Sequence, residues 1–315
     1  MAETVGLSQK KIEGCKYDLW NSDPMTKDVP RITPAQFSQK LEKIFSSLME
    51  KSEWEAPQFT KMLPIFVFGP PGIGKSQIIE SLATKFKGIK VETYIASTMD
   101  PTQVQGLPYP NRETKTTEWF PDQRFVDKDK KTRVYFFDEL NMAPSATQAA
   151  FYRLILEGKL GNIDISHALR IGAGNRVSDY EGIKQMSLPL ATRFEVYVMQ
   201  PDINDWIKWA KNKHLNKYVI EYAELAANQP STAINEESNI PSQWYCINPS
   251  EPALARATPR SWERVSQLLE VGLNTKEDIV GSLGEGPGSA FEKWYRERIN
   301  EENKSNNKYE YRERF

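Results

Sequence analysis

The sequence predicts an α/β fold with a parallel sheet, followed by a smaller all-helical domain. A nearly all-apolar run, 63–68, precedes a glycine-rich turn, as expected for a buried parallel strand. Apolar strands then alternate with helices, which is typical of a parallel sheet. From Asp202 onward the patterns are helical only. We expect strands at 63–68, 91–96, 133–137, 169–172 and 194–199.

The helices are predicted from their start signals and apolar faces. Thr33 and Pro34 form an N-terminal signal, and an apolar stripe at helical spacing follows them. The helix after the glycine-rich turn covers 76–86, and the next, 144–157, is ended by Gly158. In the C-terminal part we expect helices at 203–211, 215–227, 259–271 and 290–300.

These patterns predict four parts. Residues 1–32 form a polar, aperiodic N-terminal extension, ordered only if it packs on something. Residues 33–200 form the α/β core, which carries a hairpin insertion at 100–125. The helical domain covers 201–280, and residues 281–315 form a glycine-rich hinge with a C-terminal helix.

Composition excludes several function classes. Of 315 residues, 41 are Lys or Arg and 42 are Asp or Glu, so the net charge of -1 gives no global footprint for nucleic acid. Two distant cysteines, Cys15 and Cys246, form no disulfide framework and fit a reducing cytoplasm. No apolar run is long enough to span a bilayer, so no membrane association is expected. His167 and His214 are isolated, which argues against a histidine metal site or catalytic triad.

A phosphate-binding loop motif, G-x-x-x-x-G-K-[ST], follows the first predicted strand of the core and is met by Gly69, Gly74, Lys75 and Ser76. Its glycines allow successive N–H groups to face one concavity at a helix start, where a nucleotide triphosphate binds. Lys75 is expected to reach the β/γ-phosphates and Ser76 to ligate Mg²⁺. The alternative, a plain Gly/Pro turn, is disfavoured because the flanking strand and helix are both present.

Two acids end the third predicted strand of the core. Four apolar residues, 134–137, precede Asp138 and Glu139. Ligands of open α/β sheets bind at the carboxyl ends of the strands, which places this pair in the phosphate crevice. Asp138 is expected to hold the Mg²⁺ shell and Glu139 to polarise the attacking water. The alternative is two ordinary surface acids.

Three further residues follow at element boundaries. Asn175 ends the next strand, where an amide could orient the same water, although Asn is also common in turns. Arg193 precedes the last strand. Arg260 lies in the first turn of a helix that begins with an N-cap and a proline, where a cation opposes the helix dipole unless an anion is near. For either arginine, the alternative interpretation is an ordinary salt-bridged or solvated side chain.

Taken in order, these segments resemble the AAA+ ATPase family over residues 65–269. Within it, D-E-L-N-M-A-P at 138–144 and A-T-P-R at 257–260 resemble the MoxR group. The block at 100–109 resembles a bacterial or phage branch, and residues 157–161 stand where the group has a hairpin before sensor 1. One departure is Met142, which replaces the usual Arg and leaves open the contact between subunits that this Arg would make.

The resemblance implies an Mg²⁺-dependent ATPase that works as a ring, typically a hexamer. Asn175 would be sensor 1, Arg193 the arginine finger acting on a neighbour's ATP, and Arg260 sensor 2. Glu139, Asn175 and Arg193 are then the catalytic residues, and Ser76 and Asp138 the metal ligands. ATP would contact Gly69, Pro70, Pro71, Gly72, Ile73, Gly74, Lys75, Ser76, Gln77 and Arg260.

Two functions stay open. The first is a chaperone-like remodeller of a partner protein, such as one with a von Willebrand factor A domain, with the insertion facing that partner. The aromatic residues of the insertion are Tyr109, Trp119 and Phe120. They would contact the partner or, alternatively, pack on their own domain. The second is a motor or loader on nucleic acid that uses the interleaved basic stretch 115–133, which reads better as a solvated charged face. A small-molecule kinase fits poorly, because no second substrate pocket is recognisable.

Overall fold

The computed structural model describes residues 26–49, 63–86, 90–128, 132–177, 179, 183, 185–228, 244–245 and 255–312. These residues divide into two compact units, one ending at Pro201 and the other beginning at Asp202. We call them the α/β unit and the helical unit and describe each by itself. No helix in these ranges is long and apolar enough to cross a membrane.

Among the described residues, six parallel strands form the sheet of the α/β unit, in the order β1-β10-β2-β9-β6-β3. Strand β9 therefore lies between β2 and β6, and Phe68 at the end of β2 pairs with Gly174 at the end of β9. The carboxyl ends of these three strands meet at one edge. The strands are β1 (Arg31–Ile32), β2 (Ile65–Phe68), β3 (Lys90–Ile95), β6 (Thr132–Asp138), β9 (Leu169–Gly174) and β10 (Glu195–Met199).

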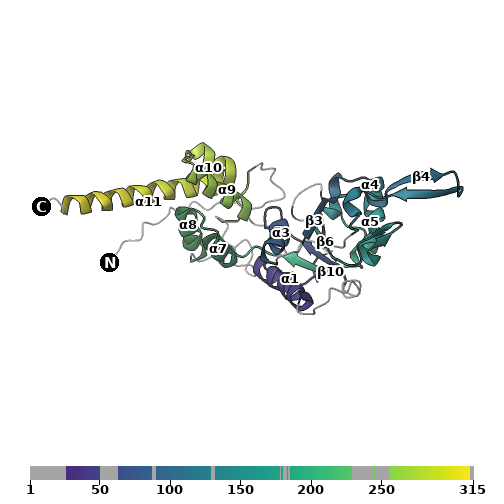
Figure 1. Cartoon of the computed structure of the whole chain (residues 1–315). Helices are drawn as coiled ribbons and strands as arrows, with labels where there is room; N and C mark the ends of the chain where they lie inside the picture. Colours follow the sequence, from purple (N-terminus) through teal and green to yellow (C-terminus); the bar gives the residue numbers. More distant parts are fainter. Residues whose placement is uncertain are drawn as a thin grey trace. The chain divides into compact units, whose positions relative to one another are not determined.

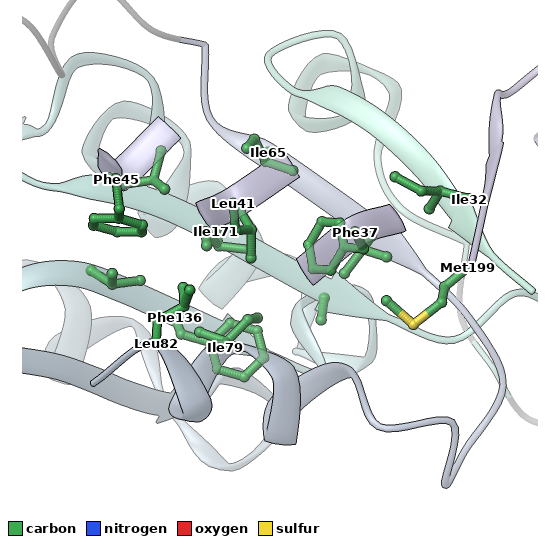
Figure 2. Close-up of a cluster of buried hydrophobic side chains, with 14 of the residues drawn as sticks. Ile32, Phe37, Leu41, Phe45, Ile65, Ile79, Leu82, Phe136, Ile171 and Met199 are labelled. Carbon is green, nitrogen blue, oxygen red and sulfur yellow. The ribbon is translucent and has the colours of Figure 1, made fainter. Parts of the chain in front are cut away.

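Helices cover both faces of the sheet. Helices α1 (Pro34–Met49) and α3 (Lys75–Lys85) enclose the cluster of buried apolar side chains in Figure 2. Phe136 belongs to this cluster, whereas the next residue of β6, Phe137, meets Phe151 of α5 (Ser145–Glu157) at 5.0 Å between ring centroids. Successive strand residues face opposite sides, so α5 lies on the other face. The cluster includes Ile32, Phe37, Leu41, Phe45, Ile65, Ile79, Leu82, Ile171 and Met199.

Two antiparallel hairpins leave the sheet. The expected insertion contains α4 (Pro101–Gln105) and then the hairpin of β4 (Leu107–Asn111) and β5 (Thr116–Phe120), which extends away from α4 and α5 (Figure 1). The second hairpin, β7 (Lys159–Leu160) with β8 (Ile163–Asp164), lies where the family resemblance predicts one. Asn162 joins the two, because its Nδ2 donates to the Trp119 carbonyl at 3.1 Å. The short elements are η1 (Ala96–Thr98), η2 (Gln123–Phe125), η3 (Leu140–Met142) and α6 (Leu188–Ala191).

Part of the predicted N-terminal extension belongs to the sheet. Residues 31–32 form β1, which pairs with β10 at the sheet edge. The N–H groups of Val198 and Gln200 donate to the carbonyls of Pro30 and Ile32, both at 2.9 Å. The edge of β10 thus obtains partners for its backbone donors, and Ile32 joins the core. The rest of the extension, 1–25, lies outside the described residues.

The helical unit is held by aromatic side chains from three helices. Tyr222 of α8 contacts Trp262 of α9 and Phe291 and Trp294 of α11, with centroid separations of 5.1 to 5.6 Å. Among the described residues after Asp202, every regular element is a helix, in agreement with the predicted helical domain. Most of the loop expected between α8 and α9 lies outside the described residues. The helices are α7 (Ile203–Asn212), α8 (Lys217–Ala227), α9 (Pro259–Glu270), α10 (Lys276–Leu283) and α11 (Glu285–Arg312).

The glycine-rich segment expected as a hinge is mostly helical. Helix α10 ends at Leu283, Gly284 turns with φ 85°, and α11 begins at Glu285. A Cβ on Gly288 would lie 2.8 Å from the Cα of Val280. Gly288 therefore permits close approach of α10 and α11, and Gly284 permits the turn between them.

Candidate nucleotide site

The phosphate-binding loop runs from the end of β2 to the start of α3. Its first residue, Gly69, donates its N–H to the Gly174 carbonyl at 3.1 Å, which fixes the loop against the end of β9. Gly74 precedes α3 with φ 101°, a left-handed conformation that favours glycine. The first N–H groups of α3 have no carbonyl partners within the helix, and they point to the carboxyl edge of the sheet. The loop can therefore bind an anion.

The other predicted contact residues of the loop take different positions. Pro70 and Ile73 are buried, and Pro71 and Gly72 are half-buried. Gly72 has φ 75°, so the loop contains two left-handed glycines. Gln77 is exposed in the first turn of α3.

The ammonium group of Lys75 hydrogen-bonds to the loop and to Asn175, the residue that directly follows β9. Its Nζ donates to the Gly69 carbonyl at 2.6 Å, the Pro70 carbonyl at 3.2 Å and Oδ1 of Asn175 at 2.9 Å. Lys75 and Asn175 are each 8% exposed. Two residues a hundred positions apart are thus brought together, because β9 lies beside β2.

Ser76 and Asp138 offer adjacent oxygen atoms. Oγ of Ser76 donates to Oδ2 of Asp138 at 2.6 Å, which joins α3 to the end of β6. A hydroxyl and a carboxylate suit Mg²⁺, which usually takes few protein ligands and completes its shell with waters and phosphates. No group of three or more His, Cys, Asp or Glu that could hold a metal occurs in the described ranges. The Ser76 hydroxyl and the Asp138 carboxylate fit a Mg²⁺ whose remaining ligands are waters and phosphate oxygens.

Glu139 has an unusual backbone. Its φ is 53°, in the left-handed region, where a residue other than glycine costs of order 1 kcal/mol or more. Its N–H donates to Oδ1 of Asp138 at 2.9 Å, and its Oε2 accepts from Oγ of Ser97 at 2.5 Å. Ser97 belongs to η1, directly after β3, the strand paired with β6. The sequence analysis missed Ser97; a hydroxyl at the end of the neighbouring strand was its only signal.

For the ATPase activity that the family resemblance implies, we expect Ser97→Ala to raise the basal rate about 2- to 10-fold. The Ser97 hydroxyl occupies Oε2 of Glu139, so its removal leaves that oxygen available to accept a hydrogen bond from a water molecule. Steady-state hydrolysis tests this, with Ser97→Thr as the matched control that keeps the hydroxyl. A lower rate in Ser97→Ala would instead show that Ser97 holds Glu139 in its working position.

Asn141 and Gln148 make buried hydrogen bonds in and near the turn that follows Asp138 and Glu139. Nδ2 of Asn141 donates to the Asn175 carbonyl at 2.8 Å, and Nε2 of Gln148 donates to the carbonyls of Asn141 and Ala143 at 3.2 and 3.1 Å. Both side chains are buried. The sequence analysis quoted Asn141 and Ala143 within the D-E-L-N-M-A-P run but assigned neither a role.

Arg193 lies away from this cluster. It directly precedes Phe194 and β10, at the amino ends of the strands, where the Glu195 N–H donates to the Pro64 carbonyl at 2.8 Å. The loop lies at the opposite, carboxyl end of β2. The guanidinium carbon is 3.5 Å from the ring centroid of Tyr152, and Nη1 donates to the Pro189 carbonyl.

Arg260 belongs to the helical unit. It is exposed in the first turn of α9, whose N-cap, Thr258, accepts from the Ser261 N–H at 3.2 Å. The Thr258 N–H donates to Oγ of Ser261 at 2.7 Å, which completes a capping box. The predicted helix start is confirmed.

The parallel sheet, the loop before α3 and the polar residues at the carboxyl edge define a protein of the P-loop class. Residues 64–194 match the AAA domain of the dynein-related subfamily, so the predicted AAA-type nucleotide-binding domain is confirmed for this segment. The match contains Lys75, Ser76, Asp138, Glu139, Asn175 and Arg193. A comparison with curated proteins found no match.

Among solved structures, the chain is similar to a candidate ATPase from Cytophaga hutchinsonii ATCC 33406. The identity is 14% and the TM-score 0.34, over 66% of this chain. The chain spans 61% of the length of that structure.

Proposed function

We propose that this chain is an Mg²⁺-dependent AAA+ ATPase that hydrolyses ATP to ADP and phosphate. The observation that carries the proposal is the meeting of Lys75 with Asn175, and of Ser76 with Asp138, at one edge of the sheet. An AAA domain match over the same residues supports it.

Each residue of the cluster has a proposed role. The loop N–H groups and Lys75 would bind the phosphates, and Ser76 and Asp138 would hold Mg²⁺, which would neutralise charge on the phosphate oxygens. Glu139 accepts the proton of the attacking water, and Asn175 orients that water. Arg260, proposed from the family resemblance as sensor 2, would contact the nucleotide from the helical domain.

The position of Arg193 favours action on a neighbouring subunit. It precedes β10, and the loop follows β2, its parallel neighbour. Four residue steps along these strands span about 13 Å, so the Arg193 backbone lies far from its own phosphate loop. An arginine supplied to a neighbour's site requires head-to-tail contacts, and such contacts form a ring when the rotation between subunits closes. We therefore propose a ring oligomer, in the family typically a hexamer.

The test of the ATPase proposal is Lys75→Ala. Hydrogen bonds to charged groups contribute about 1.5–3 kcal/mol, so the loss of Lys75 should weaken ATP binding about 10- to 100-fold and remove most hydrolysis. Fluorescent-nucleotide titration and phosphate release measure the two quantities, with Glu80→Ala on the exposed face of α3 as control. Hydrolysis at the wild-type rate in Lys75→Ala would overturn the proposed site.

We propose that this chain, as a MoxR-like ATPase, uses the energy of ATP hydrolysis to remodel a partner protein. The β4–β5 hairpin exposes the three predicted aromatic contacts, with 56% exposure of Tyr109, 40% of Trp119 and 54% of Phe120. The alternative that they pack on their own domain is therefore disfavoured, although Tyr109 and Phe120 touch each other at 5.3 Å between centroids. A protein with a von Willebrand factor A domain is the proposed class of partner, taken from the family resemblance.

The nucleic-acid alternative finds less support. Arg124 of the basic stretch donates to Oδ1 and Oδ2 of Asp122 at 3.0 and 2.9 Å, and it lies over the Tyr94 ring at 5.0 Å. The hydrogen bonds with Arg124 lower the pKa of Asp122, so this pair stays charged and mutually neutralised. Lys130 and Lys131 lie outside the described residues. Stimulation of the ATPase by DNA or RNA that fades steeply with salt would support the alternative.

A further inference from the structure

Helix α5 contacts the arginine that the proposed function assigns to a neighbouring active site. The Arg193 guanidinium lies over the ring of Tyr152, with its carbon 3.5 Å from the ring centroid. Its Nη1 donates to the Pro189 carbonyl of α6. Among the described residues, Nε of Arg193 is buried and has no hydrogen-bond partner. The ring face and one carbonyl are therefore the contacts that the structure gives this guanidinium.

The same helix contacts the start of α6 one turn earlier. Oε1 of Gln148 accepts from the N–H of Ser187, the residue that precedes α6, at 3.4 Å. Nε2 of Gln148 donates to the carbonyls of Asn141 and Ala143, in the turn that directly follows Asp138 and Glu139. Gln148 is 5% exposed, so its amide is shielded from competing water. One buried side chain thus joins the turn that follows Asp138 and Glu139, which we call the acid turn, to the start of α6, a helix that ends two residues before Arg193.

Gln148 and Tyr152 are four residues apart and share one face of α5. The first holds the beginning of α6 and the second holds the arginine just after its end. Helix α5 itself begins at Ser145, seven residues after Asp138. The arginine and the acid turn of one chain are therefore fixed to the same rigid helix.

We propose that Tyr152 and Gln148 form a clamp that positions Arg193 for the neighbouring subunit and ties it to the acid turn of its own chain. The proposal rests on the proposed function, because it assumes that Arg193 acts on a neighbour's ATP. Tyr152 supplies a flat face on which a planar guanidinium stacks, as arginines do on aromatic rings. Both residues are positioning residues and touch no nucleotide.

The experiment compares Tyr152→Leu with Tyr152→Phe. The Leu variant loses the aromatic face, and we expect kcat to fall about 10-fold or more, because small misplacements of catalytic groups cost up to about 100-fold. KM, nucleotide affinity and oligomer mass should stay unchanged. The Phe variant keeps the ring and should retain kcat within about 3-fold. Tyr152→Gln is a second loss variant, because the position is half-buried and tolerates a polar side chain.

A double-mutant cycle separates positioning from general damage. If Tyr152 acts through Arg193, Tyr152→Leu should lower kcat no further in an Arg193→Ala background. Additive losses, or an unchanged kcat in both loss variants while Arg193→Ala is inactive, would overturn the clamp and leave the proposed function standing. Full turnover in Arg193→Ala would instead overturn the arginine role on which the clamp rests. Gln148→Met should reproduce the loss of kcat with ATP still bound, and a wild-type rate would remove Gln148 from the clamp.

Discussion

Glu139→Gln is expected to lower ATP hydrolysis about 10²- to 10⁴-fold while the protein still binds ATP. The substitution keeps the shape and the hydrogen bond with Ser97 but removes the base, and general-base catalysis typically contributes this factor. Nucleotide affinity should hold because Lys75, Ser76 and Asp138 are untouched. Phosphate release and nucleotide titration measure the two quantities on the same preparation.

The same variant should hold the partner-bound state, because ATP stays in place. Affinity capture from the native host, with ATP and Mg²⁺ present, then tests both proposed uses of the energy. Recovery of a von Willebrand factor A protein that survives nuclease treatment would support the remodelling function. Recovery of nucleic acid with its binding proteins would contradict it. Tyr109→Ser in the Glu139→Gln background serves as the matched control, since it should reduce capture without changing ATP binding.

Arg193→Ala is expected to bind ATP normally and to hydrolyse it about 10³- to 10⁵-fold more slowly, the range seen for arginines that stabilise γ-phosphate charge. Because the Arg193 backbone lies beyond the amino end of β10, away from its own phosphate loop, we expect the loss to arise in the neighbour's site. Steady-state hydrolysis on the assembled oligomer measures the loss. Arg193→Lys is the matched control, because it keeps the charge but loses the planar fork, and it should rescue only in part.

Mixing two inactive variants distinguishes action within a chain from action between chains. Glu139→Gln subunits keep Arg193, and Arg193→Ala subunits keep Glu139. In a randomly mixed ring of equal parts, a site is complete when an Arg193→Ala subunit meets a Glu139→Gln neighbour on the correct side. Activity should then return to about a quarter of the wild-type value, because each of the two conditions holds for half of the subunits. A mixture that stays inactive after verified subunit exchange would assign Arg193 to its own chain.

The fold was predictable because its signals are local. Buried parallel strands read as apolar runs, and the helix starts at Pro34, Ser145 and Pro259 follow proline or N-cap signals. Two elements, β1 and α10, were missed for the opposite reason. Strand β1 consists of two residues, and β1 exists because the edge of β10 needs backbone partners, which no local pattern records. Helix α10 was obscured by the glycine-rich stretch at its end, in which Gly284 forms the turn and Gly288 of α11 permits close approach to Val280.

The motif residues of the candidate site were predictable from the sequence, but the residues that contact and position them were not. Lys75, Ser76, Asp138 and Glu139 stand in spacings that phosphate chemistry requires. Ser97, Gln148 and Tyr152 act through contacts with residues 40 or so positions away, and each residue type is common in its element. Only the pairing of β3 with β6, and the packing of α5 on α6, bring them to the residues they contact.

The β4 edge of the β4–β5 hairpin lacks backbone N–H donors at two positions. Trp119 pairs with Pro108, and its carbonyl turns away from that partner to accept from Asn162. In an antiparallel ladder, Pro108, the residue paired with Trp119, also directs its backbone groups away from the partner strand. The backbone groups of Pro110, two residues later, point the same way. Neither proline has an N–H, so a free strand finds no donors at these two positions of β4. The hairpin can therefore present its aromatic side chains to a partner without seeding edge-to-edge aggregation along β4.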